Sequence, residues 1–157
     1  ALEMLNSAVI ECPDDTWDDT KYKNPFWHIA YHTLFYTHLY LHPREEDFVP
    51  WEKHRNESQH LGPLPYPPHD TPEIFEQYTK EDILTYLDLC VDQVGAKRPD
   101  LDLNTQSGFA WLPFGKLELQ FYNIRHIQHH AGQLIDRLGA QGLSINWVGT
   151  TPRKPHA

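Results

Sequence analysis

The spacing of apolar residues along the chain predicts four helices. In residues 2–11, 79–95 and 116–138, apolar side chains recur three or four positions apart, which places them on one face of a helix. Residues 25–42 differ because their apolar side chains point in nearly every direction around the helix axis. Such a helix is surrounded by several neighbours, so a polar residue within it needs a structural or functional reason.

Residues that favour helix ends flank these segments. Asn24 is suited to cap the second helix and Pro25 to begin it. Thr79 and Asp82 resemble a capping box at the start of the third helix, with Asp in place of the usual Glu. The expected stop signals are Pro43, Gly95 and Gly139.

The last helix, residues 116–138, has the clearest apolar stripe. At about 100° per residue, one face gathers the residues Leu117, Phe121, Ile124, Ile127, Ala131, Leu134, Ile135 and Leu138. We expect this face to be buried. His129 falls nearly opposite it, so a solvent-exposed side chain is expected there. His130 lies at the edge of this face, and His126 lies farther round on the same side.

Two long connections complete the chain. Residues 43–78 are rich in proline, charge and aromatic side chains, and we expect an ordered loop that forms a wall or lid of a site. Residues 96–115 form a second loop, and Ile145, Trp147 and Val148 are expected to pack back on the helices, with 149–157 loose. The prediction is therefore an all-α, four-helix bundle with long ordered loops, in a single domain spanning residues 1–157.

Composition and charge narrow the range of partners. Hydrophobic residues make up 39% of the 157 residues, which indicates a globular fold. The net charge is −9 without a dense Lys/Arg patch, which disfavours nucleic acid and anionic membrane surfaces. No apolar run is long enough for a membrane span and no signal peptide is evident, so a cytoplasmic location is expected. Cys90, within an apolar stretch, is expected to be a buried free thiol.

The candidate chemistry begins with a pair of histidines. His126 and His130 lie four positions apart, which places both imidazoles on one side of a helix at a spacing that suits one metal ion. The spacing alone is not decisive in a chain with 11 histidines. A hydrogen-bonded pair or a solvated face explains it as well.

A second histidine-rich stretch, residues 27–35, could supply a third ligand. It offers His28 and His32, and His32 lies in the middle of the apolar helix, where an unpaired imidazole would be costly. Either a hydrogen-bond partner or a metal ion would account for its burial. His38 and His42 lie near the helix C-terminus, where protonated imidazole interacts favourably with the helix dipole.

Three histidines would leave a coordination position open, as in catalytic rather than structural metal sites. Zn²⁺, Ni²⁺ or Fe²⁺ would accept such ligands, and a bound water or thiol would become a nucleophile. Asn123, Tyr31 and Gln133 are candidates to orient the imidazoles. The chain contains no His-Glu-x-x-His motif and no Gly-rich phosphate loop.

Two stretches resemble the DinB/YfiT-like superfamily. They are Trp-His-Ile-Ala-Tyr-His-Thr-Leu-Phe at 27–35 and Asn-Ile-Arg-His-Ile-Gln-His-His-Ala-Gly-Gln-Leu at 123–134. The resemblance implies a four-helix bundle, often dimeric, with a divalent metal ion on His32, His126 and His130, while His129 matches a histidine that is not a ligand. It leaves open whether His28 replaces or supplements His32. The first helix is shorter than is usual in that superfamily, so residues are expected before Ala1.

The resemblance leaves three functions open. Relatives include thiol S-transferases, which favours a metal-dependent transferase acting on a small molecule with a low-molecular-weight thiol. A metal-dependent hydrolase would use the same ligands with water as nucleophile, although only Glu118 suggests itself as a base, on an uncertain face of the helix. The third possibility is a non-catalytic metal-binding or dimerising bundle of a stress response.

Overall fold

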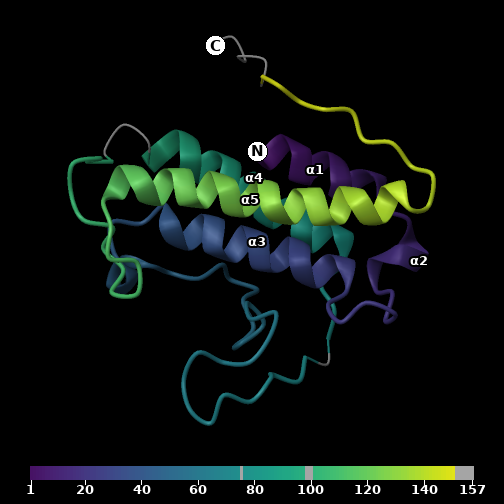
Figure 1. Ribbon diagram of the computed structural model, residues 1–157, viewed down its shortest axis with the longest axis horizontal. Helices are drawn as coiled ribbons and strands as arrows, with labels where there is room; N and C mark the ends of the chain where they lie inside the picture. Colours follow the sequence, from purple (N-terminus) through teal and green to yellow (C-terminus); the bar gives the residue numbers. More distant parts are fainter. Residues whose placement is uncertain (75, 98–100, 151–157) are drawn as a thin grey trace.

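The computed structural model describes residues 1–74, 76–97 and 101–150, and within these ranges the protein is all-α (Figure 1). The elements are α1 (Leu2–Glu11), α2 (Asp14–Trp17), α3 (Phe26–Tyr40), the 3-10 turn η1 (Glu45–Asp47), α4 (Lys80–Lys97) and α5 (Lys116–Gly139). Pairing of β type in the described ranges is limited to one isolated bridge between Gln106 and Gly115. The four longer helices confirm the predicted segments, and α2 is an additional turn within the connection around Trp17.

The long helices lie side by side, with α3 and α1 each in contact with both α4 and α5. Figure 1 shows that α3 and α5 run in opposite directions along most of their length. The fully buried aromatic side chains Phe26, Tyr31, Tyr78 and Tyr86 come from α3, α4 and the loop between them, and leucines of α1 and α5 complete the core. Tyr31 stacks on Tyr78 with ring centroids 4.4 Å apart, so aromatic packing joins the loop to the helices.

The predicted helix ends are partly correct. Thr79 and Asp82 form the expected capping box, because each side chain accepts a hydrogen bond from the other's main-chain N–H at 3.1 Å. Asn24 does not cap α3, since its side-chain amide donates to the carbonyl of Leu61 instead. Pro25 holds the cap position without a side-chain hydrogen bond. Gly95 does not stop α4, which continues to Lys97 because glycine in a solvated last turn is tolerated.

The buried face of α5 differs from the predicted one. Its second half follows the prediction, with Ala131, Leu134 and Leu138 buried. In the first half, the predicted residues Leu117, Phe121 and Ile124 are 48%, 59% and 50% exposed. The helix instead buries Lys116, Leu119 and Asn123, which rotates the inward face past the apolar stripe. Polar contacts of Lys116 and Asn123 with α3 and its C-terminal extension favour this rotation.

The loop between α3 and α4 is ordered against the helices. Trp51 is buried and stacks on Tyr86 with ring centroids 4.6 Å apart and an interplanar angle of 8°. Beyond α5, Ile145 and Val148 pack against the core as expected, and the Val148 main-chain N–H lies 3.1 Å from the sulfur of Met4. Trp147 is 82% exposed and does not pack as expected. Residues 151–157 lie outside the described ranges, so the expected loose tail stays a prediction for them.

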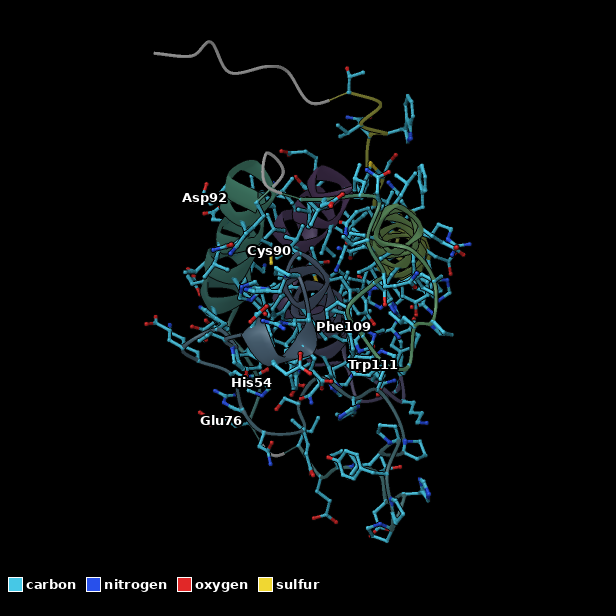
Figure 2. The ribbon with its side chains drawn as sticks, turned by 90° about the vertical axis from the view of Figure 1, so that its left-hand side faces the viewer. His54, Glu76, Cys90, Asp92, Phe109 and Trp111 are labelled. Atoms are coloured by element: carbon cyan, nitrogen blue, oxygen red, sulfur yellow. The ribbon has the colours of Figure 1, made fainter. Side chains whose placement is uncertain are left out.

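Cys90 is buried and unpaired, as predicted, and burial raises the pKa of its thiol. Cys90 belongs to α4, and Figure 2 shows it on the side of this helix that faces the other helices. None of the described helices combines the length and apolarity needed to cross a membrane.

Candidate metal centre

The candidate site forms where α3 and α5 cross in antiparallel orientation. Side chains of α5 hold this register by donating to main-chain carbonyls of α3. Gln120 donates to Tyr40 at 3.2 Å, and Asn123 donates to Thr37 at 3.3 Å. This register places His126, which is one turn beyond Tyr122, opposite the middle of α3.

The structure brings together the three histidines predicted as ligands. His32 Nε2 and His126 Nε2 lie 3.0 Å apart, and the His130 ring centroid lies 4.8 Å from that of His32 and 4.6 Å from that of His126. Each residue offers one ring nitrogen, and these three atoms lie within 4.8 Å of one another. The cluster could therefore hold a metal ion.

Hydrogen bonds at the opposite ring nitrogens orient two of the imidazoles. His32 Nδ1–H donates to the main-chain carbonyl of Gln59 at 2.6 Å, and His130 Nδ1–H donates to Gln133 Oε1 at 2.7 Å. In both neutral rings the proton is therefore on Nδ1, and the Nε2 lone pair is free to bind a cation. His126 differs, because its buried Nδ1 has no partner within the described ranges.

The surroundings keep the three imidazoles neutral. Burial lowers the pKa of His32 well below its usual value, against the effect of its bond to Gln59. Burial also lowers the pKa of His126 to about 4, with a further contribution from His130. The pKa of His130 is lowered for the same main reason. Three neutral nitrogen donors that disfavour protons fit a divalent cation, whose charge they can stabilise together.

The remaining histidines of these helices lie elsewhere. His28 is buried, but its Nε2–H donates to the Ser58 carbonyl at 2.9 Å, and it does not belong to the cluster of His32, His126 and His130. His129 is exposed, as predicted. His38 and His42 are buried, and burial lowers the pKa of His38 to about 4. The expected protonated imidazole at the C-terminus of the helix is therefore wrong for His38.

Only one of the three candidate orienting residues contacts the cluster. Gln133 does so through His130, as described above. Asn123 instead contacts α3, and the Tyr31 hydroxyl lies 2.6 Å from Nδ1 of His54. The partner of His32 is the main chain of Gln59, which sequence reasoning missed because any residue type supplies a carbonyl.

A cavity of about 770 Å³ opens next to the histidines. Its lining combines the cluster with aromatic side chains of α3 and α5 and with part of the 43–78 loop, which confirms that this loop forms a wall. The lining residues are His32, Phe35, Tyr36, Leu39, Tyr40, Glu45, Phe48, Gln59, His60, Pro65, Tyr66, Trp111, Tyr122, His126 and His130. A cavity of this size and composition suits a small organic molecule.

The chain was compared with protein-family models, curated proteins and solved structures, and none of them matches it.

Proposed function

We propose that the protein is a metal-dependent enzyme that transfers a low-molecular-weight thiol to a small electrophilic molecule. His32, His126 and His130 would hold the divalent ion, which could be zinc, nickel or iron. The observation that carries the proposal is the convergence of three neutral imidazoles beside a cavity of about 770 Å³. A closed structural site would not need such a cavity.

The residues around the cluster favour a thiol over water as the nucleophile. When bound, the cation would lower the pKa of a coordinated thiol, so that no separate base is needed for its deprotonation. Hydrolysis would need a nearby base, but no carboxylate belongs to the cluster within the described ranges. Glu118 is exposed and does not line the cavity.

The proposed reaction is a substitution or addition at an electrophilic carbon. The thiol loses its proton to solvent, and its sulfur forms the new bond to carbon. In a substitution, the leaving group departs with the bonding electron pair. In an addition or the opening of an epoxide, the electron pair of the broken bond moves to the atom next to the attacked carbon, and that atom takes up a proton from solvent. The chain's own contribution is to fix the imidazole orientation through Gln59 and Gln133 and to exclude water with the aromatic lining.

The fold supports the predicted relationship to the DinB/YfiT-like superfamily as part of this proposal. The contacts of α1, α3, α4 and α5 suit a four-helix bundle. The proposed homodimer draws support from the exposed Leu117, Phe121 and Ile124 on α5. A cytoplasmic location belongs to the same proposal, since the cytoplasm maintains free thiols.

The test is conjugation measured by mass spectrometry. Protein loaded with zinc, nickel or iron(II) is incubated with 1-chloro-2,4-dinitrobenzene or an epoxide and with cysteine, glutathione or cysteamine. We expect metal-dependent conjugates that disappear in His126→Ala/His130→Ala and persist in His129→Ala. Metal binding without conjugation of any of these thiols would reject the transferase, and thiol-independent ester cleavage would favour the hydrolase.

A further inference from the structure

The cavity extends along the groove between α3 and α5, away from the metal-binding histidines. On α3 its lining continues from His32 through Tyr36 to Tyr40, and on α5 from His130 back to Tyr122. The Tyr40 and Tyr122 rings meet with centroids 5.7 Å apart. Eight helical residues span about 12 Å, so the groove has two distinct ends separated by about that length.

Aromatic side chains and one carboxylate form the far end. Trp111 joins Tyr40 and Tyr122 in the lining, and Figure 2 shows Trp111 next to Phe109 in the loop before α5. Glu45, in η1, lines the cavity just beyond the C-terminus of α3. The face of an aromatic ring and a carboxylate both attract a cation.

The charges around Glu45 leave its carboxylate available. The neighbouring Arg44 pairs with Asp47 at 2.9 Å rather than with Glu45. In the described ranges Glu45 forms no ion pair, and no Lys or Arg lines the cavity. Arg125 lies 5.8 Å from the centroid of the Tyr122 ring and Lys116 lies 5.4 Å from that of Phe109, but neither lines the cavity. Glu45 is therefore the charged side chain that a ligand at this end would meet directly.

We infer that the far end of the groove binds the ammonium group of an amine with an apolar body, oriented so that its other end reaches the histidines. This inference rests on the proposed function in one respect, because it takes the end of the groove at His32, His126 and His130 as the place where the substrate reacts. Tyr40, Tyr122 and Trp111 contact the apolar body and the cation, and Glu45 supplies the opposite charge. The class of substrate is therefore a cationic, aromatic or aliphatic amine about two helical turns long.

The experiment compares three probes of the same shape and different charge. Binding of 4-phenylbutylamine, 4-phenylbutanol and 4-phenylbutanoate is measured by calorimetry on metal-free protein at pH 7.5, so that no ligand can bind a metal ion. We expect the amine to bind at least about fivefold more tightly than the alcohol and the acid most weakly. Glu45→Gln should bring the amine to within about twofold of the alcohol.

Glu46→Gln is the matched control, because this neighbouring carboxylate does not line the cavity. It should leave the selectivity for the amine unchanged, whereas Trp111→Leu should reduce it. Equal binding of amine and acid, or equal effects of the two glutamate substitutions, would overturn the inference. Because these measurements use metal-free protein, failure of the metal-dependent reaction would leave their outcome unaffected.

Discussion

His32 Nε2 and His126 Nε2 lie 3.0 Å apart in the interior between α3 and α5. The bond from His32 Nδ1–H to Gln59 leaves the His32 Nε2 lone pair directed at His126. The contact is favourable only when a proton or a cation lies between the two nitrogens. In the metal-free protein His126 would supply the proton, which leaves its buried Nδ1 as an acceptor without a described partner. A cation between the two Nε2 atoms would remove the repulsion between their lone pairs. The proton of the neutral His126 ring would then have to lie on its buried Nδ1.

The first prediction concerns metal stoichiometry. Untagged protein should bind one zinc ion, and His32→Ala or His126→Ala/His130→Ala should lose it, because each removes at least one of the three converging nitrogens. Elemental analysis after dialysis measures the ratio. His129→Ala, one residue from a proposed ligand but exposed, should retain full stoichiometry. Zinc retained by the double variant would show that the metal binds elsewhere.

Metal affinity should also depend on Gln133. Replacing it by Leu removes the acceptor of the His130 Nδ1–H bond, so the ring loses the contact that fixes its orientation. We expect zinc affinity to fall about tenfold, which is the smaller end of the effects seen when a metal ligand loses its hydrogen-bond partner. The effect should be small because Gln133 is exposed and a water molecule can take its place. Competition with a chromophoric chelator gives the affinity. Gln128→Leu, exposed on the same helix, should change it less than twofold.

The sequence predicts the cluster of His32, His126 and His130 better than it predicts the contacts that surround this cluster. The spacing of His126 and His130 indicates that both lie on one side of a regular helix, and the cost of burying His32 together with the family resemblance adds the third member of the cluster. The contact with Gln59 could not be predicted, because it depends on the path of a long loop. The same limit applies to Asn24, whose amide bonds the Leu61 carbonyl in that loop instead of capping α3.

The face of α5 illustrates a second limit. Hydrophobic periodicity places Phe121 inside, but the helix buries Asn123 and Lys116 at its expense. Tertiary hydrogen bonds to carbonyls at the end of α3 decide this rotation, and no pattern within α5 encodes them. An apolar stripe therefore predicts that a helix is amphipathic, and its partners determine which residues face the core.

Stability should fall in mild acid, in part because of His38. Burial, with smaller contributions from His42 and Lys97, lowers the pKa of this imidazole from its usual 6.5 to about 4. As pH falls from about 6.5 to 4, the unfolded chain binds the proton before the folded one, so the free energy of unfolding decreases. His38 contributes up to about 3 kcal/mol to this loss, at about 1.4 kcal/mol per pKa unit.

Urea unfolding of metal-free protein between pH 7.5 and 4 measures the effect. His38→Gln should flatten the pH dependence relative to the wild type, even if its stability at pH 7.5 is lower. The exposed His129→Gln should follow the wild type. Parallel curves for His38→Gln and the wild type would contradict the assignment.

Gly108 should be intolerant of any side chain. Its φ of +87° is unfavourable for other residues, and a Cβ atom there would lie 1.9 Å from the Pro43 carbonyl oxygen. We expect Gly108→Ala to destabilise the protein by at least about 2 kcal/mol, measured by urea unfolding. Gly95→Ala provides the opposite case, because nothing lies within 4 Å of its added Cβ in α4. That substitution should be neutral or stabilise by up to about 1 kcal/mol.

Lys116 connects the start of α5 to the end of α3. The side chain is only 2% exposed, and its ammonium donates to the carbonyls of His42, Pro43 and Ser107. Lys116 is the first residue of α5, and a positive charge is unfavourable at the N-terminus of a helix. Its ammonium, however, reaches the carbonyls just beyond the C-terminus of α3, and a positive charge is favourable at that end of a helix. Among the residues that the structure describes, no carboxylate pairs with this ammonium, and the three main-chain carbonyls accept its hydrogen bonds instead.

Lys116→Met keeps the length and apolar volume of the side chain but leaves these carbonyls without their donor. We expect a loss of about 2–4 kcal/mol in urea unfolding, since each buried unsatisfied acceptor costs about 1–3 kcal/mol and solvent can reach part of the loop. Lys23→Met, at an exposed position, should change stability by less than about 0.5 kcal/mol. Equal stability of the two variants would mean that the buried ammonium contributes no net stabilisation, as occurs when desolvation offsets the hydrogen bonds.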